Sequence, residues 1–284
     1  MAAQWLGRWK QRGNVVQARV DAARADHRSV ELGFGIARRD SDIGGGLLAG
    51  ALAYRTFVLL VPTALLLVAG LGLYAGSVDK TTSAVASEAG LHGLIASEVA
   101  ATAASRHRAV VFLLMLPAVA YGTMTLYRAI ARVHAIAWFG SGRNVRVTRR
   151  GVGVFVVALV LQFVAIEIVG WIRRTNQFGG LAILLVYLVV VGGSWFAVSI
   201  DLPRRPLSVV HLLPGALLVG VGMLFVNVFN VYVTARLVEN RGNTYGALGI
   251  ATALLFSLVL AGRLIVVSAE LNAVLSEPRH RPLS

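Results

Sequence analysis

Four ionisable side chains fall inside long apolar stretches of this sequence, where a charge is expensive in a membrane. They are Arg55, Glu167, Arg263 and Glu270. An ionisable residue within a membrane span usually faces the bundle interior or a water-filled cavity, and such residues mark paths for substrates, ions or protons. Any chemistry in this chain is therefore expected to centre on these positions.

The two arginines form the first candidate site. At about 1.5 Å per helical residue, Arg55 and Arg263 are both expected in the inner third of the bilayer, where they repel each other unless an anion joins them. Glu270, two helical turns after Arg263, could supply that charge in a buried network that fixes helix register. A phosphate-bearing lipid could also supply it, because the planar guanidinium group binds two oxygens at once. The residues leave both interpretations open.

Three further polar residues lie in predicted spans. Glu167 could relay protons, or it could form a hydrogen bond to a neighbouring helix. Asn227 and Asn230 are three residues apart and share a helix face, so both join the candidate substrate-binding set. They could line a polar path, or bond across helices, which is the commoner use of such residues.

A basic stretch follows the second apolar block. Residues 128–150 contain six arginines and no acidic residue. Arginines beside a span can bind anionic lipid headgroups, or they can simply signal the topology of the chain. The candidate headgroup-binding residues are Arg128, Arg132, Arg146, Arg149 and Arg150.

No catalytic centre, cofactor or metal site is indicated. The chain has no cysteine, which excludes thiol catalysis, iron–sulfur clusters and cysteine-based zinc sites. Motifs of zinc proteases, phosphate-binding loops, serine hydrolases and dinucleotide-binding folds are missing from the sequence. Its 13 acidic residues include five within the first 43, too scattered for the clustered carboxylates of a metal-dependent nuclease. We expect a protein that is not an enzyme.

Composition and apolar blocks predict the elements that position these residues. The chain is 57% hydrophobic and 14% charged, whereas soluble domains carry roughly 25% charged residues. A span needs about 20 apolar residues, which predicts an all-α polytopic membrane protein with about six transmembrane helices. The predicted spans are residues 45–75, 109–130, 152–172, 181–200, 212–234 and 245–270, within a membrane domain of residues 44–276.

Segments outside the spans are short. Residues 1–43 are expected to form a cytoplasmic arm with an amphipathic, interfacial helix, residues 77–108 short amphipathic helices on the outer surface, and residues 277–284 a cytoplasmic tail. With both termini inside, cytoplasmic segments hold 18 Lys and Arg residues against 7 outside, as the positive-inside rule requires. The net charge of +14 is thus attributed to topology and anionic lipid, and no nucleic-acid partner is expected.

Four motifs in order resemble the YihY/virulence factor BrkB family of bacterial membrane proteins. The first is Asp-Ile-Gly-Gly-Gly-Leu-Leu-Ala-Gly-Ala-Leu-Ala-Tyr followed by an apolar run to Pro62. The others resemble the Pro-Gly-Ala opening of the fifth span, a Tyr-Gly-Ser-Leu element and a Gly-Ala-Glu-Leu-Asn element. They lie here at residues 42–54, 213–217, 245–249 and 269–274.

The resemblance implies six helices and the bacterial inner membrane. It also implies a poorly defined biochemical function and a family name that descends from a mistaken ribonuclease assignment. Glu270 matches the family pattern, whereas Arg55 and Arg263 occupy positions where most relatives are expected to have an aromatic or apolar residue. An arginine site would therefore be a feature of a subgroup.

Two function classes remain open from the sequence. The favoured hypothesis is a transporter or lipid-translocating protein for an anionic lipid or other amphiphile, with membrane lipids as its partners. The alternative is a non-enzymatic scaffold or binding protein of the cell envelope, with its N-terminal arm as the partner surface.

Overall fold

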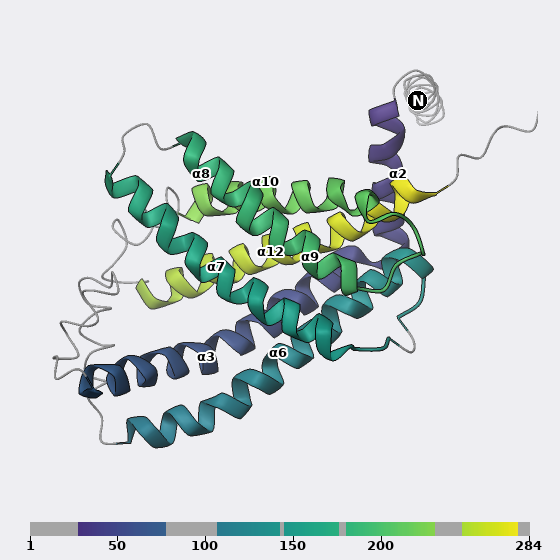
Figure 1. Cartoon of the computed structure of the whole chain (residues 1–284). Helices are drawn as coiled ribbons and strands as arrows, with labels where there is room; N and C mark the ends of the chain where they lie inside the picture. The colour runs from purple at the N-terminus through teal and green to yellow at the C-terminus, as the bar shows by residue number, and fades with distance from the viewer. Residues whose placement is uncertain (1–27, 78–106, 143–144, 176–179, 231–245, 278–284) are drawn as a thin grey trace, which may run out of the picture.

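The computed structural model describes residues 28–77, 107–142, 145–175, 180–230 and 246–277 (Figure 1). Helices make up nearly all of these residues, and no strand occurs among them. The helices are α2 (Arg28–Ile43), α3 (Gly45–Ser77), α6 (Arg108–Phe139), α7 (Arg149–Thr175), α8 (Gly180–Val186), the π-helical turn η1 (Tyr187–Gly192), α9 (Gly193–Asp201), the 3-10 turn η2 (Val209–Leu212), α10 (Leu213–Phe229) and α12 (Gly246–Ser276).

The predicted all-α polytopic class is confirmed. Five helical rods in the described part of the chain are long and apolar enough to cross a membrane: Gly45–Ala75, Arg108–Phe139, Gly180–Asp201, Val209–Phe229 and Leu254–Ser276. The third predicted span coincides with α7, a 27-residue helix that is not among these five. The count of six spans and the orientation of the chain stay predictions, and the helices expected within residues 77–108 lie outside the described residues.

Large apolar side chains cover the outside of the bundle. Leu47 is 84% exposed, Phe225 68% and Leu113 65%. Soluble monomers rarely expose apolar patches on this scale, and such surfaces mark contact with a membrane or a partner. Lipid is therefore the environment that these helices fit.

Helix α2 lies across one end of the bundle, here called the α2 end (Figure 1). At this end α3 begins, while α6 and α12 terminate. Gly44, between α2 and α3, has φ of 67°, a left-handed conformation that glycine adopts without a steric penalty. This residue lets the chain turn sharply from α2 into the first span.

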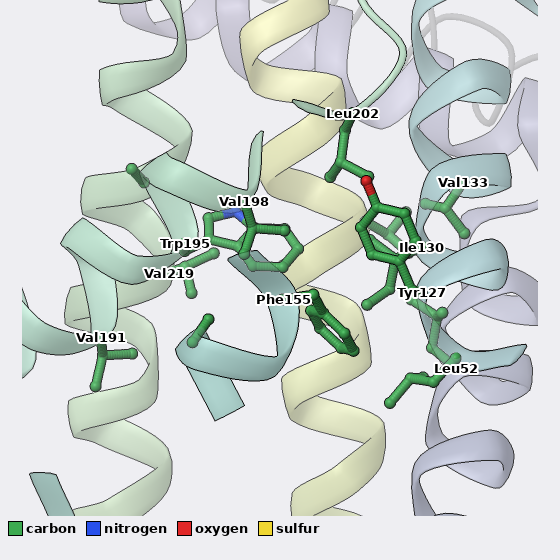
Figure 2. Close-up of a cluster of buried hydrophobic side chains, with 14 of the residues drawn as sticks. Leu52, Tyr127, Ile130, Val133, Phe155, Val191, Trp195, Val198, Leu202 and Val219 are labelled. Carbon is green, nitrogen blue, oxygen red and sulfur yellow. The ribbon is translucent and has the colours of Figure 1, made fainter. Parts of the chain in front are cut away.

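A cluster of aromatic and aliphatic side chains holds the middle helices together (Figure 2). The rings of Tyr127 on α6 and Phe155 on α7 have centroids 5.6 Å apart. Trp195 on α9 lies 5.8 Å from the ring of His134 on α6. Offset aromatic pairs at these separations stabilise packing beyond simple burial of area, so the cluster orders α6, α7 and α9 around one core.

Helices η1 and α10 approach each other backbone to backbone. A Cβ added at Gly192 would lie 3.2 Å from the carbonyl oxygen of Ala216, and one at Gly220 would lie 3.2 Å from that of Tyr187. Small residues permit this approach, and close packing is a main source of helix association in membranes. The π-helical turn lies at this contact, inside the continuous rod Gly180–Asp201.

The start of α10 is joined to α12 by a buried amide. The Gly215 backbone N–H donates to Asn272 Oδ1 at 2.9 Å, and Asn272 Nδ2 donates to the Leu212 carbonyl at 3.4 Å. The first N–H groups of a helix have no partner within the helix, so Asn272 caps α10 from another element. One helical turn earlier, Ser268 Oγ accepts a hydrogen bond of 3.2 Å from Trp195 Nε1.

Gly46 and Gly50 of α3 do not form its contact with α12. A Cβ at either position would meet nothing within 4 Å. The close approach of α3 occurs at Ala49, whose carbonyl oxygen would lie 2.6 Å from a Cβ at Gly262 on α12. The glycine that matters for this crossing is therefore on the partner helix.

These contacts predict that one glycine substitution destabilises the protein and that another does not. A Cβ at Gly215 would lie 2.7 Å from the Ser268 carbonyl oxygen and would also overlap the Asn272 amide. We expect Gly215→Ala to lower unfolding free energy by about 1–3 kcal/mol, the usual cost of overpacking, measured as thermal melting in detergent. Gly46→Ala is the matched control and should leave melting within error. Equal melting of the two variants would contradict the capping contact.

Candidate functional site

The central polar feature of the α2 end is an ion pair between α2 and α12. Arg263 Nη1 and Nη2 donate to Asp40 Oδ1 and Oδ2 at 2.5 and 2.7 Å. Two parallel bonds of this kind are among the strongest ion-pair geometries. The pair is partly accessible, with 40% of the Arg263 side chain and 21% of the Asp40 side chain exposed, so an external anion can reach the guanidinium group.

Glycine and glutamate complete the surroundings of the pair. Gly45 is buried at the first turn of α3, and a Cβ there would overlap the Asp40 carboxylate and lie 3.0 Å from Arg263 Nη1. Glu270, two helical turns after Arg263 on α12, is 0% exposed. Its carboxyl is close enough to that of Asp40 to share a hydrogen bond with it when one of the two is protonated, so a buried carboxyl adjoins the ion pair.

The Asp40 carboxyl is held in its charged form. The hydrogen bonds from Arg263 lower its pKa from the usual 3.8, partial burial opposes this, and the nearby Arg263 charge and the Glu270 carboxyl lower it further. The influence of Glu270 places the two carboxyls side by side, and two ionised carboxylates repel. A proton on Glu270 would turn that contact into a hydrogen bond to Asp40, which is chemistry that a lone ion pair does not offer.

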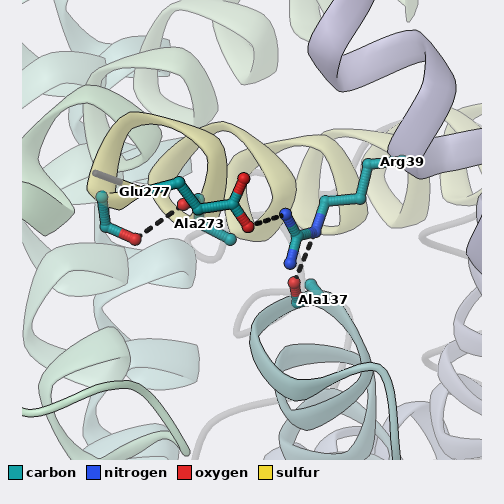
Figure 3. A network of polar contacts seen from close by, with 5 residues as sticks. Arg39, Ala137, Ala273 and Glu277 are labelled. Atoms are coloured by element: carbon teal, nitrogen blue, oxygen red, sulfur yellow. Dashed lines mark hydrogen bonds and ion pairs between the residues drawn. The ribbon is translucent and has the colours of Figure 1, made fainter. Parts of the chain in front are cut away.

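A second set of contacts attaches α2 to the same end (Figure 3). Arg39 Nε donates to the Ala137 carbonyl at 2.7 Å, and its Nη1 donates to Glu277 Oε1 at 2.6 Å. Ala137 lies in the last turn of α6, whose terminal carbonyl groups lack partners within the helix. Arg39 therefore bridges the ends of α6 and α12, while its neighbour Asp40 is bonded to Arg263 deeper in α12.

An apolar groove between α10 and α12 includes Arg263 in its lining. It has a volume of about 660 Å³, and its walls include Leu218, Gly222 and Phe225 of α10 with Leu260, Leu264 and Arg263 of α12. Arg263 contributes the sole charged side chain of the described lining. A cavity of this size with one oriented polar group is typical of sites for small molecules.

The structure gives the two predicted arginines different neighbours. Arg263 bonds to Asp40, whereas exposed Arg55 makes a 3.4 Å hydrogen bond to the Thr125 carbonyl on α6. The predicted partner of Arg263, Glu270, acts on it only through charge. The hydrogen bonds of the two arginines do not join them to each other, because Arg55 lies on the face of α3 that meets α6, and one shared arginine site stays a prediction.

The remaining predicted residues are distributed along the bundle. Asn230 accepts a hydrogen bond of 2.5 Å from Ser257 Oγ on α12, the cross-helix role that the sequence left open. Asn227 lies one turn earlier on α10 and is half-buried. Glu167 is within α7, but its side chain lies outside the described part of the structure.

The candidate headgroup-binding arginines are all exposed. Arg128 and Arg132 lie on the C-terminal half of α6, and Arg149 and Arg150 open α7. Positive charge in the first turn of a helix opposes the helix dipole, so folding of α7 does not explain these residues. Arg150 Nε lies 3.6 Å from Asp201 Oδ2 with its side chain 78% exposed, which makes that pair a weak one.

Sequence reasoning missed Asp40, the residue that completes the site. The family-like motif begins at Asp42, which is exposed, and the partner lies two residues earlier on the inward face of α2. The signal available was the run Ala-Arg-Arg-Asp-Ser-Asp-Ile directly before Gly44, since charges beside a span need partners. The arrangement places a partly exposed guanidinium group between a carboxylate and an apolar groove; in the described residues, no three His, Asp or Glu side chains could hold a metal ion.

Comparison with known proteins gives two matches. The family model described as Virulence factor BrkB matches residues 36–284, which includes Arg39 and Asp40. The ribonuclease-like protein YfkH of Bacillus subtilis (strain 168) is 31% identical over 99 residues, and the alignment covers 34% of each chain. No solved structure matches the chain.

The lowered pKa of Asp40 predicts how attachment of α2 responds to pH. Because the attached carboxyl has the lower pKa, its contribution is present above the usual value of 3.8 and is lost as the pH falls below it. Spin labels on Ala37→Cys and Ala120→Cys, in a chain without cysteine, should give one narrow distance distribution between about pH 5 and 8 that broadens below about pH 4.

Two carboxyl variants separate this effect from general loss of charge. Asp40→Asn should raise the detached population at pH 7 about tenfold, as loss of one charge-assisted contact would do. Asp42→Asn removes the same charge two residues away and should change nothing. Identical distributions for the two variants would show that the ion pair does not hold α2.

Proposed function

The chain belongs to the virulence factor BrkB family, and from that premise we propose that this membrane protein is a transporter or lipid-translocating protein for an anionic amphiphile. One observation carries the proposal: among the described residues that line an apolar groove, a single one is charged, Arg263. An amphiphile needs an apolar surface for its chain and a cation for its head, and the groove between α10 and α12 offers both.

The composition of the groove supports an acyl chain as its occupant. Leu218 and Phe225 of α10 and Leu264 of α12 line a space of about 660 Å³. Within lipid, binding in an apolar groove gains no free energy from the exclusion of water. The affinity of the groove for a ligand therefore depends on its shape and on the charged group that it contains. A ligand that offered only an apolar chain would leave Arg263 unused.

Asp40 supports exchange rather than permanent capture of the anion. Its carboxylate occupies both Nη atoms of Arg263, as a lipid phosphate would through two of its oxygens. A headgroup that replaces Asp40 would release the C-terminal end of α2 from Arg263, and the return of Asp40 to Arg263 would expel the headgroup. Arginine is suited to this exchange because it retains its charge throughout.

Location and chemical class complete the proposal. We place the protein in the bacterial inner membrane with both termini in the cytoplasm, supported by the basic loop residues and by family membership. We also propose that it is not an enzyme. The word ribonuclease in the name of the Bacillus subtilis relative describes that protein, which aligns over a third of this chain.

Lipid movement in proteoliposomes tests the proposed function. Wild-type protein should speed transfer of fluorescent phosphatidylglycerol between leaflets over that in empty vesicles, with phosphatidylcholine moving more slowly. Arg263→Gln should reduce the rate about tenfold, equivalent to about 1.4 kcal/mol of lost binding. Leu218→Trp, which fills the groove, should also reduce it.

The charge partner supplies the sharpest control. If Arg263 binds the headgroup, Asp40→Asn removes a competitor and should tighten phosphatidylglycerol binding while Arg263→Gln weakens it. If the pair is only structural, both variants break the same contact and should lose activity together. Arg38→Gln, an exposed charge on α2, should behave as wild type, and absence of any movement above empty vesicles would sink the proposal.

A further inference from the structure

A second cavity opens at the α2 end, away from the groove of Arg263. It lies where α6 ends and where the connections before α7 and after α9 meet, and its volume is about 870 Å³. Its walls include Phe139, Arg146, Asp201, Arg204, Arg205 and Leu207. We call it the basic cleft, because three arginines and one carboxylate are the charged residues of its described lining.

The segment that forms one wall is held in place. Leu202 is 3% exposed within the main core, and Leu207 packs against a smaller cluster that contains Trp138 and Leu212. Arg204 Nη1 donates to the Leu207 carbonyl at 2.7 Å, and Pro203 and Pro206 restrict the backbone around it. A preordered loop loses little entropy on binding a ligand.

The charges of the cleft are poorly balanced from within. Asp201, the one carboxylate of the described lining, shares that lining with three arginines and also lies 3.6 Å from Arg150, which is outside the lining. Neither Arg146 nor Arg205 forms an ion pair within the described residues. Arg205 is half-buried, and a guanidinium group in that position has reduced access to water, which strengthens its attraction for an anion.

From these features we propose that the basic cleft binds a phosphate group, through Arg146 and Arg205 with Arg204 at its side. Planar guanidinium groups pair with phosphate oxygens two at a time, and a doubly charged phosphate monoester is the anion that several converging arginines fit best. The group can belong to a soluble phosphate ester or to a lipid headgroup. This site shares no residue with the groove, so it is independent of the proposed transport function.

Topology signalling alone would not require this arrangement. An arginine that only orients the chain needs to be exposed near the end of a span, as Arg149 is at the start of α7. Arg205 instead lines a cavity between Pro203 and Leu207, and the apolar walls from Val145 and Leu202 limit the ligand to a small molecule. The volume falls within the usual range for such sites, about 300–1,000 Å³.

Calorimetry on the full chain in phosphatidylcholine nanodiscs tests the inference. Inorganic phosphate and glycerol 3-phosphate serve as soluble probes, and nanodiscs containing phosphatidate supply the lipid source. Wild-type protein should bind at least one of them, and Arg146→Gln and Arg205→Gln should each weaken that binding about tenfold. Arg205→Lys, which keeps the charge but loses the fork, should fall between these variants and wild type.

The controls identify the source and keep a failed fold apart from a failed site. Binding of the soluble probes that phosphatidate does not reduce assigns the site to a soluble ester; retention of phosphatidate alone assigns it to lipid. Arg38→Gln should bind as wild type, and melting temperatures of all variants should match. No binding by wild-type protein, or equal binding by Arg205→Gln and Arg38→Gln, would overturn the inference, whatever the outcome of the lipid-movement assay.

Discussion

The polar residues of α12 are the contacts on which the rest of the bundle depends. Apolar burial gives helices little preference for one another in lipid, so specific hydrogen bonds and close backbone approach decide their arrangement. Along α12, Arg263 holds α2, Ser268 bonds to Trp195 of α9, and Asn272 caps α10. Gly262 adds the close crossing with α3. A single helix thereby sets the positions of four others.

The same helix contains the groups that suit an anion-handling protein. Arg263 lines an apolar groove and is bonded to a carboxylate on a helix that lies across the end of the bundle, and Glu270 is buried beside that carboxylate. A purely structural ion pair needs no adjoining groove. The proposed exchange of Asp40 for an external anion rests on this combination, and it would break one of the contacts that hold α2.

Two family-like motifs prove to be halves of one contact. The Pro-Gly-Ala opening of α10 and the Glu-Leu-Asn element of α12 lie 57 residues apart between Gly215 and Asn272, yet they meet through a 2.9 Å hydrogen bond. The absence of a side chain at Gly215 leaves room for the amide and for the Ser268 carbonyl. Sequence motifs of this kind record a tertiary contact even where each motif by itself is unspecific.

The length of the apolar blocks and the density of arginine between them were sufficient to predict an all-helical membrane protein. The bilayer fixes the length of a span, and it requires every backbone N–H and C=O group in the span to be hydrogen-bonded within the protein. The same reasoning found Arg263 and Glu270, since a charge within an apolar block stands out in any sequence. It could not find Asp40, the partner of Arg263. Asp40 and Asp42 are two residues apart on one helix, and Asp42 is the one that belongs to the family-like motif. Only the turn at Gly44 and the crossing of α2 over α12 decide which of the two carboxylates faces inward. Likewise Arg55 and Arg263 share an expected depth, but rotation of each helix about its axis sends one to α6 and the other to α2. The depth of a residue in the bilayer follows from counting residues along its helix. The neighbour that its side chain faces depends on contacts between elements far apart in the sequence.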